Sequence, residues 1–308
     1  MWRSFSQPIK LPENKSPEEM EQYFREQKLS GVLEKRINGK PLALLMASGA
    51  PVGTYSLEND IATHISHSDF SATSYQEFQA SHLPDNVARM VWLTLESKLK
   101  EKIVLNNSES WKSQQEKLRT SSWSGLLEIY SDSLHGIAFL NHGEENKTEA
   151  IFQDSTGFSN NFTFMEEASH YPCEATLFET SSASQAYQCY ILHKGTIDWA
   201  DKLLERYKEM VGSKMLQLMG RELNRSISPW RWNIVLQNTS LIDAHFFPNL
   251  ESAAHAYRAI FMGMGTQMNF FIGNILTQRL LNETYEQLFP EEKDSLKSQR
   301  LIPAAFTE

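Results

Sequence analysis

LSGVLE, the stretch Leu29–Glu34, recurs as WSGLLE at Trp123–Glu128 and decides the fold of the first half of the chain. Each copy is followed by an apolar run, which is Leu42–Met46 in the first copy and Ile137–Leu140 in the second. Internal repetition of this kind defines the modules of a chain before any single element is assigned. The first half is therefore expected to contain the same small unit twice.

Glycines hold matching positions in the two copies. Gly31 and Gly49 lie 18 positions apart, and so do Gly125 and Gly143. Ser-Gly followed by apolar residues is typical of a turn that leads into a strand. The pair Asn38–Gly39 predicts a two-residue hairpin turn, because both residue types tolerate a positive φ. The repeated unit is therefore predicted to be rich in β-structure.

Other segments predict the elements around these hairpins. Ser16–Glu19 combines an N-cap serine, a proline at the first helical position and a capping-box glutamate, so a helix is expected there. Glu109–Leu118 is compatible with a helix before the second copy. Pro84–Leu105 has apolar residues at helical spacing and is predicted to be a helix. Ala175–Glu179 and Ala186–His193 are expected to form paired strands.

The apolar spacing becomes helical from Asp198 onward. We expect a helix that ends at Gly212, a second helix directly after it, and a short strand at Trp232–Gln237. Leu250–Phe289 is predicted to be a long helix, kinked or divided at Gly263–Gly265. The residues expected on its inward face are Tyr257, Ile260, Phe261, Met264, Met268, Phe271, Ile275 and Leu276.

These patterns predict an α+β protein. Two small β-rich modules with associated helices are followed by a mainly α-helical C-terminal domain. We expect the first module at residues 1–105, the second at 106–195 and the helical domain at 196–308.

Composition limits the classes of partner. The chain has 308 residues, 41% of them hydrophobic and 22% charged, which is typical of globular proteins. Its formal charge of −9 argues against nucleic acid and against anionic lipid, since both select basic surfaces. Cys173 and Cys189 fit no zinc pattern and are expected to be buried free thiols in a reducing cytosol, with a disulfide as the alternative.

No membrane segment is predicted. The amino terminus has no apolar core of a secretion signal. Ala259–Leu276 is the most apolar stretch, but polar residues and glycines interrupt it, so a buried core helix is favoured over a membrane span. We therefore expect a cytoplasmic protein.

The repeated frame resembles the PATAN domain, the amino-terminal module of PatA-type bacterial response regulators. Its pattern is a helix, Ser-Gly-x-Leu, a turn, an apolar strand and then Gly-x-x-Val. The matching residues are Ser30, Gly31, Leu33, Gly39, Gly49 and Val52 in the first copy, and Ser124, Gly125, Leu127 and Gly143 in the second. The second copy lacks the closing valine. The resemblance implies a non-catalytic α+β module that makes protein contacts in bacterial signalling, without catalytic residues or cofactors. The residues of a receiver domain are missing, so no phosphorelay is implied.

Arginine and tryptophan are interleaved just before the short strand predicted in the helical domain. Arg221, Arg225 and Arg231 occur with Trp230 and Trp232. Such residues can stack bases or hold an anion, and they are also common hot spots of protein interfaces. Because the chain is acidic, packing of the tryptophans or a partner or anion site is favoured over nucleic acid.

Two further binding candidates lie in the helical domain. His245 stands beside two phenylalanines, which suits either a ligand or acid/base role or a hydrogen-bonded core histidine. Met264, Met268 and Phe271 could line an apolar ligand pocket or an adaptable protein groove, with plain core packing as the alternative.

Other polar clusters carry no assignment. His64 and His67 resemble metal ligands and Asp69 could add an oxygen ligand, but no further ligand at matching spacing is evident, so a polar loop is expected. Glu166–Glu167 with His170 could form an acid/base set, and a solvated turn is favoured. The chain has no P-loop, dinucleotide fingerprint, nucleophile elbow or His-Glu-x-x-His motif. No catalytic residue, metal site or cofactor is therefore predicted.

Three functions remain as hypotheses. The first is a non-enzymatic regulatory or scaffold protein in bacterial signalling, which binds another protein or a second copy of itself. The second is a small-molecule sensor with an apolar pocket near Met264 and Phe271 in the helical C-terminal domain. The third is an enzyme with a carboxylate/histidine pair around His245.

Overall fold

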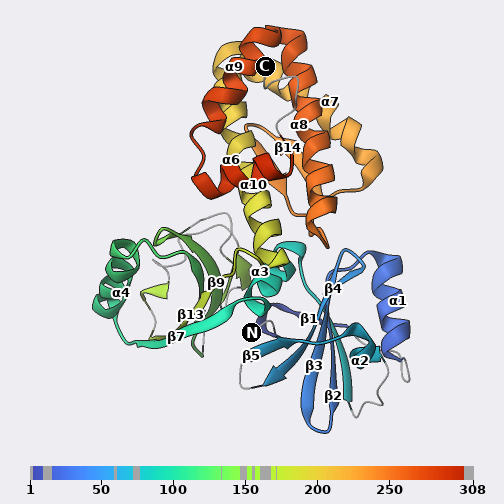
Figure 1. The fold of residues 1–308 in the computed structure, drawn as a ribbon, viewed down its shortest axis with the longest axis vertical. Helices are drawn as coiled ribbons and strands as arrows, with labels where there is room; N and C mark the ends of the chain where they lie inside the picture. The colour runs from blue at the N-terminus through green and yellow to red at the C-terminus, as the bar shows by residue number, and fades with distance from the viewer. Residues whose placement is uncertain are drawn as a thin grey trace. The chain divides into compact units, whose positions relative to one another are not determined.

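The computed structural model divides the chain into two compact units (Figure 1). We call Met1–Tyr187 the sheet unit and Gln188–Glu308 the helical unit. The structure describes residues 3–9, 16–58, 61–71, 77–132, 134–145, 151–154, 157–159, 168–170 and 172–301. Antiparallel sheets with helices come first and a mainly helical region follows, which confirms the predicted α+β class.

The first sheet of the sheet unit has the strand order β1-β6-β2-β3-β4-β5. Its strands are β1 (Gln7–Pro8), β2 (Gly31–Ile37), β3 (Lys40–Ala47), β4 (Ala50–Glu58), β5 (Ile61–His64) and β6 (Glu77–His82). The accompanying helices are η1 (Arg3–Phe5), α1 (Pro17–Gln27), α2 (His67–Ser71) and α3 (Asp85–Leu95). Every neighbouring pair of strands is antiparallel.

The second sheet has the order β7-β13-β8-β9-β11-β12, with the short β10 also paired to β9. Its strands are β7 (Lys98–Leu105), β8 (Gly125–Tyr130), β9 (Leu134–Asn141), β10 (Glu144–Glu145), β11 (Ile151–Asp154), β12 (Gly157–Ser159) and β13 (Cys173–Glu179). Helix α4 (Ser108–Thr120) precedes β8, as α1 precedes β2. The two sheets thus share one topology, in which a late strand inserts between the first strand and the hairpin.

The helical unit contains one small hairpin. Its elements are α6 (Gln185–Val211), α7 (Ser213–Ile227), η3 (Ser228–Trp230), β14 (Ile234–Gln237), β15 (Ser240–Asp243), α8 (Leu250–Ile272), α9 (Asn274–Tyr285) and α10 (Pro290–Ser298). Helix α6 begins three residues before the boundary between the units. The core of the helical unit is centred on large buried side chains such as Trp199, Tyr257 and Phe261.

The glycine frame has the same structural cause in both copies. Gly49 and Gly143 occupy the turn after the second strand of the hairpin, with φ of +87° and +78°. The N–H of Gly49 donates to the carbonyl of Leu29 (2.8 Å), and that of Gly143 donates to the carbonyl of Trp123 (2.6 Å). A positive φ and a close backbone approach both favour glycine. The repeated glycine thus allows this turn to lie against the end of the preceding helix, and this explains the equal spacing in both copies.

The serine of the motif makes a second hydrogen bond to the same turn. The backbone N–H of Ser48 donates to Oγ of Ser30 (2.8 Å), and that of His142 donates to Oγ of Ser124 (3.0 Å). Each serine thus satisfies a backbone donor of the turn, which would otherwise have to find water. The Ser-Gly motif is explained by backbone geometry.

Several local predictions are confirmed. Helix α1 has Ser16 as its N-cap with both hydrogen bonds of the capping box. Asn38 and Gly39 both have positive φ, 51° and 80°, in the tight turn between β2 and β3. The helix expected from Glu109 to Leu118 is present as α4.

The prediction of a helix over Pro84–Leu105 is wrong for its second half. It ends at Leu95, and Lys98–Leu105 forms β7, which pairs with β13. Residues 98–105 therefore belong to the second sheet, although we placed them in the first module at residues 1–105. Leu99, Ile103 and Leu105 fit the period of a strand as well as that of a helix, so spacing alone did not separate the two.

The strand predicted at Ala186–His193 is also wrong, because this segment begins α6. The division between units falls after Tyr187, whereas we expected it near residue 195. A short, continuously apolar run does not distinguish a buried strand from a buried helix. The serines and the threonine that precede this segment form the turn at the start of α6.

The long C-terminal helix breaks later than predicted. Helix α8 runs unbroken through Gly263–Gly265, and the break lies at Gly273, with φ +78°. A Cβ at Gly263 would lie 2.7 Å from Cδ1 of Leu223, so this glycine admits a neighbouring helix. Ile275 and Leu276 are exposed, which contradicts their predicted inward position, because the break rotates α9 relative to the periodicity of α8.

Side chains cap the edges of the β14–β15 hairpin. The amide of Asn224 accepts from the N–H of Leu236 (2.8 Å) and donates to its carbonyl (3.0 Å). On the other edge, Oδ1 of Asp201 accepts from the N–H of Leu241 (2.8 Å). These bonds hold β14 against α7 and β15 against α6.

Candidate functional site

Trp230 and Trp232 form a stacked pair on the helical unit. Their ring centroids are 5.2 Å apart and their planes differ by 11°. Arg231 between them has φ +57°, and this left-handed residue follows the 3-10 turn η3. Trp230 is 54% exposed, whereas Trp232 packs edge-on to the buried Phe247. One indole is therefore half-buried against the core and stacks on the other, which is at the surface.

His255 of α8 supports the pair from a second element. Its ring meets Trp230 edge-on at 5.2 Å and Trp232 at 6.1 Å. Helices α7 and α8 pack against each other, as Figure 1 also shows. Two packed elements therefore fix the position of an exposed tryptophan, which is the arrangement of a preformed contact site.

Three exposed arginines lie in the same stretch of chain as this pair. Arg221 and Arg225 lie one turn apart on the exposed side of α7, and the side chain of Arg225 is 81% exposed. Arg231 is exposed as well. We call the following set the tryptophan surface: Arg221, Arg225, Trp230, Arg231, Trp232 and His255. The five arginine and tryptophan candidates thus lie on α7, η3 and the residues directly after η3, and His255 was missed because it is remote in the chain.

An apolar stripe continues along α8 from His255. Met262 is 63% exposed and Phe270 is 80% exposed. Residues 255, 262 and 270 fall on one face of a helix and span about 22 Å at about 1.5 Å per residue. Large apolar side chains on an outer helix face are typical of an interaction surface when they form a continuous patch.

His245 is half-buried, and a more extensive polar network lies behind it. Its backbone N–H donates to Oδ1 of Asp243 (2.9 Å), and its ring packs edge-on to Phe247 with the centroids 4.4 Å apart. The buried carboxylate of Asp243 also accepts from the hydroxyl of Tyr257 (2.7 Å) and lies 3.0 Å from Nδ1 of the buried His193. This network has no local signal in the sequence, because Tyr257 and His193 are 14 and 50 positions from Asp243.

The cysteines are unsuited to nucleophilic chemistry beside this network. Cys189 lies one turn before His193 on α6 and is buried. Burial raises the pKa of its thiol to about 12 and that of Cys173 to about 11. Both thiols stay protonated near neutral pH, so the thiolate that attack requires is scarce. The expected pair of buried free cysteines is present.

The methionine candidates belong to the core. Met264 and Met268 are fully buried among the side chains of the helical unit, and Phe271 is half-buried beside Phe270. This is the plain packing that was the alternative to a ligand pocket.

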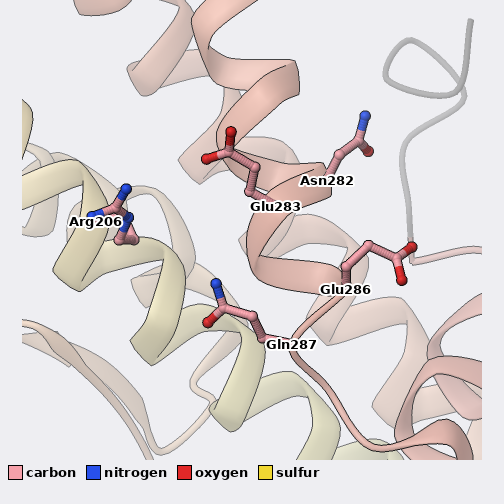
Figure 2. Close-up of a pocket in the computed structure, with 5 residues that line it drawn as sticks. All are labelled: Arg206, Asn282, Glu283, Glu286 and Gln287. Atoms are coloured by element: carbon pink, nitrogen blue, oxygen red, sulfur yellow. The ribbon is translucent and has the colours of Figure 1, made fainter.

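An open pocket of about 640 Å³ lies elsewhere in the helical unit (Figure 2). It is lined by Arg206, Asn282, Glu283, Glu286 and Gln287. Figure 2 shows Arg206 on α6 opposite the polar side chains at the end of α9. The charged members already form exposed ion pairs, with Glu209, Arg279 and Lys293 as their partners. Exposed, paired charges contribute little to ligand binding, so this pocket is the weaker candidate.

The other polar candidates of the sequence are His64, His67 and the Glu166–Glu167 pair with His170. His64 is exposed, and Nε2 of His67 lies 3.4 Å from a carboxylate oxygen of Glu21. Within the described ranges, no group of three His, Cys, Asp or Glu side chains could hold a metal ion. His170 is exposed, and Glu166–Glu167 lie outside the described residues.

A second polar cluster, found only in the structure, tethers the start of the described chain. His135 of β9 is buried; its Nε2 lies 2.9 Å from Oε1 of Glu128, and its Nδ1 is hydrogen-bonded to the hydroxyl of Ser4. Phe5 packs on the same imidazole at 4.4 Å. Because Phe5 covers the ring, the cluster acts as an anchor for η1 on the second sheet.

Asp201, which accepts a hydrogen bond from the β14–β15 hairpin, allows a test of stability against pH. Burial raises the pKa of its carboxyl to about 6, although the bond from Leu241 opposes this. The folded state therefore binds this proton more tightly than the unfolded chain, and the resulting stability is present below about pH 4 and lost as pH rises through 6. We expect Asp201→Asn to stabilise the protein by about 1 kcal/mol at pH 7.5, a value reduced for partial exposure.

Urea unfolding at pH 4 and pH 7.5 measures this effect, and the gain should vanish at the lower pH. The exposed Glu205→Gln on the same helix is the control and should change little at either pH. An equal gain at both values would contradict the assigned cause.

Among the described residues, no helix is long and apolar enough to cross a membrane. No protein-family model, curated protein or solved structure matches this chain.

Proposed function

We propose that this chain is a non-enzymatic regulatory or scaffold protein that acts by binding another protein through the tryptophan surface. The observation that carries the proposal is the exposed indole of Trp230, stacked on Trp232 and supported by His255. Tryptophan and arginine dominate the hot spots of protein interfaces. A side chain already fixed before binding loses little conformational entropy when the partner arrives.

The α8 stripe enlarges the area available to a partner. Met262 and Phe270 extend the apolar part of the surface beyond the indoles, while the arginines provide a polar rim. An apolar centre with a polar rim is the usual composition of a protein interface. The resemblance of the repeated sequence frame to the PATAN domain, which stays a prediction, implies protein contacts in bacterial signalling and agrees with this proposal.

The competing functions have less support. The sensor hypothesis needs an apolar pocket near Met264, whose side chain is fully buried in the core. The enzyme hypothesis places its pair at His245, where Asp243 is occupied by Tyr257 and His193. Neither site offers the exposed, preformed contact that Trp230 provides.

Trp230→Ala is expected to weaken partner binding by about 30-fold or more, the effect of a hot-spot residue worth about 2 kcal/mol. Native mass spectrometry of the full chain from its own cells measures this as the loss of an associated polypeptide mass. Unfolding stability should fall by less than about 1 kcal/mol, since the side chain is half exposed.

Met210→Ala is the matched control, because Met210 is 47% exposed on α6 and lies outside the tryptophan surface. It should leave the associated mass unchanged. Equal retention of the partner by Trp230→Ala would refute this site, and a bound mass of metabolite size would favour the sensor.

A further inference from the structure

The outward face of α7 is basic, and η3 with Trp230 follows α7 directly in the chain. Lys214, Leu218, Arg221 and Arg225 follow one another at intervals of three or four residues, so they share one face. All four are exposed, and the opposite face is buried. The distance along the axis from Lys214 to Arg225 is about 17 Å. The exposed Arg231 extends the row beyond the end of the helix.

Three of these four cations have no carboxylate partner among the described residues. Glu222 is the acidic residue between Ser213 and Trp232, and it lies 3.7 Å from Arg225. Lys214, Arg221 and Arg231 form no ion pair with a carboxylate in the part of the chain that the structure describes. A row of four exposed cations with a single carboxylate partner is unexpected in a chain with a formal charge of −9. Its potential would attract an anionic group that comes from outside.

The indole at the end of this row requires an apolar neighbour as well. Trp232 covers one face of Trp230, and His255 meets its edge. The exposed remainder can take one large apolar or aromatic side chain, which would release water from the indole on binding. Anionic and apolar contacts are therefore needed side by side.

We infer that the partner presents an acidic segment of polypeptide with a large apolar or aromatic side chain at one end. The carboxylates pair with Lys214, Arg221, Arg225 and Arg231, and the apolar side chain packs on Trp230. Arginine binds carboxylates with two parallel hydrogen bonds, which gives the segment a defined direction. This inference rests on the proposed function and names the chemistry of its partner.

Other anionic partners fit less well. Bases of single-stranded nucleic acid stack on aromatic faces, but the two indoles already use their facing sides on each other. A long polyanion or an anionic membrane would also meet the repulsion of a chain with net charge −9. A short acidic segment meets only the local positive row.

Selection from a random peptide library displayed on phage tests the inference. The full chain is the bait, and peptides that also bind Trp230→Ala are removed. Selected peptides are then measured by fluorescence anisotropy against the wild type and against R221Q/R225Q/R231Q. The control variant K208Q/K297Q/R300Q removes the same number of exposed charges from the helical unit outside the tryptophan surface.

We expect selected peptides rich in Asp and Glu with an aromatic residue, and affinities that fall as salt rises. The surface variant should bind them about tenfold more weakly, and the control should bind them as the wild type does. Neutral or basic peptides that depend on Trp230 would overturn the inference and leave the proposed function intact.

A selection without any Trp230-dependent peptide would overturn both proposals. Vesicles of phosphatidylglycerol and phosphatidylcholine and a thymidine oligonucleotide are tested in parallel. Tight binding of either one through the three arginines, without acidic peptides, would overturn the partner class.

Discussion

Lys194→Met is expected to destabilise the helical unit by about 3–5 kcal/mol, the cost of leaving a buried charge without its partner. Lys194 is 5% exposed; its Nζ is hydrogen-bonded to Glu292 and lies 2.7 Å from Oδ2 of Asp198. Glu292 of α10 is fully buried. Without the ammonium group, the Glu292 carboxylate would have to be protonated or drawn out of the core together with α10.

The pKa values support this expectation. Burial raises the pKa of Glu292, and Lys194 offsets only part of the rise. In the variant that pKa should rise further, so the folded state would gain protons and stability as pH falls. Urea unfolding at pH 5 and pH 8 should therefore show a smaller loss at the lower pH.

A double variant separates the charge from the packing. Lys194→Met with Glu292→Leu removes both charges and should recover most of the lost stability, because a hydrophobic pair can replace a buried ion pair. The exposed Lys208→Met on the same helix is the control. A loss below about 1 kcal/mol for Lys194→Met would show that the pair does not hold α10 in place.

Gly143→Ala is expected to cost about 3 kcal/mol or more in the sheet unit. The residue has φ +78°, and a Cβ there would lie 2.6 Å from backbone atoms of Arg119. Left-handed backbone alone costs an alanine about 1 kcal/mol. The rest comes from the collision with the end of α4, which cannot move without breaking the bond from Gly143 to Trp123.

Two further glycines form a graded series with it. Gly39 has φ +80° with nothing within 4 Å of the added Cβ, so Gly39→Ala should cost only about 1 kcal/mol. Gly49 has a similar φ, and its Cβ would lie 3.0 Å from the backbone of Arg25, which places Gly49→Ala between the other two. Thermal unfolding of the three variants measures the order, and equal losses would exclude the collision as a cause.

The parts of the fold that were predicted correctly depend on local backbone chemistry. The capping box at Ser16 and the turn at Asn38–Gly39 each involve residues within four positions of one another, so the sequence shows them directly. The repeated glycines were also readable, because each repeat places the same turn against the same helix end. Ala186–His193 was misassigned because a buried apolar run fits either a helix or a strand.

The candidate site likewise contains some residues that could be predicted from the sequence and others that could not. Trp230, Trp232 and the three arginines lie within 12 consecutive residues, from 221 to 232, and could be found from composition. His255 and the pairing of His193 with Asp243 depend on tertiary packing between α6, β15 and α8, for which one sequence has no local signal. The exposure of Ile275 could not be predicted from the sequence either, because it depends on the break in the helix at Gly273.

The edges of the β14–β15 hairpin have a consequence for self-association. A two-stranded sheet offers unpaired backbone groups on both sides, and such edges are templates for amyloid-like growth and domain swapping. Here the side-chain amide of Asn224 bonds both the N–H and the carbonyl of Leu236, as the peptide group of a third strand would. The carboxylate of Asp201 accepts from the N–H of Leu241 on the other edge. The exposed apolar pair Val235 and Ile242 can therefore remain on the surface without recruiting a foreign strand.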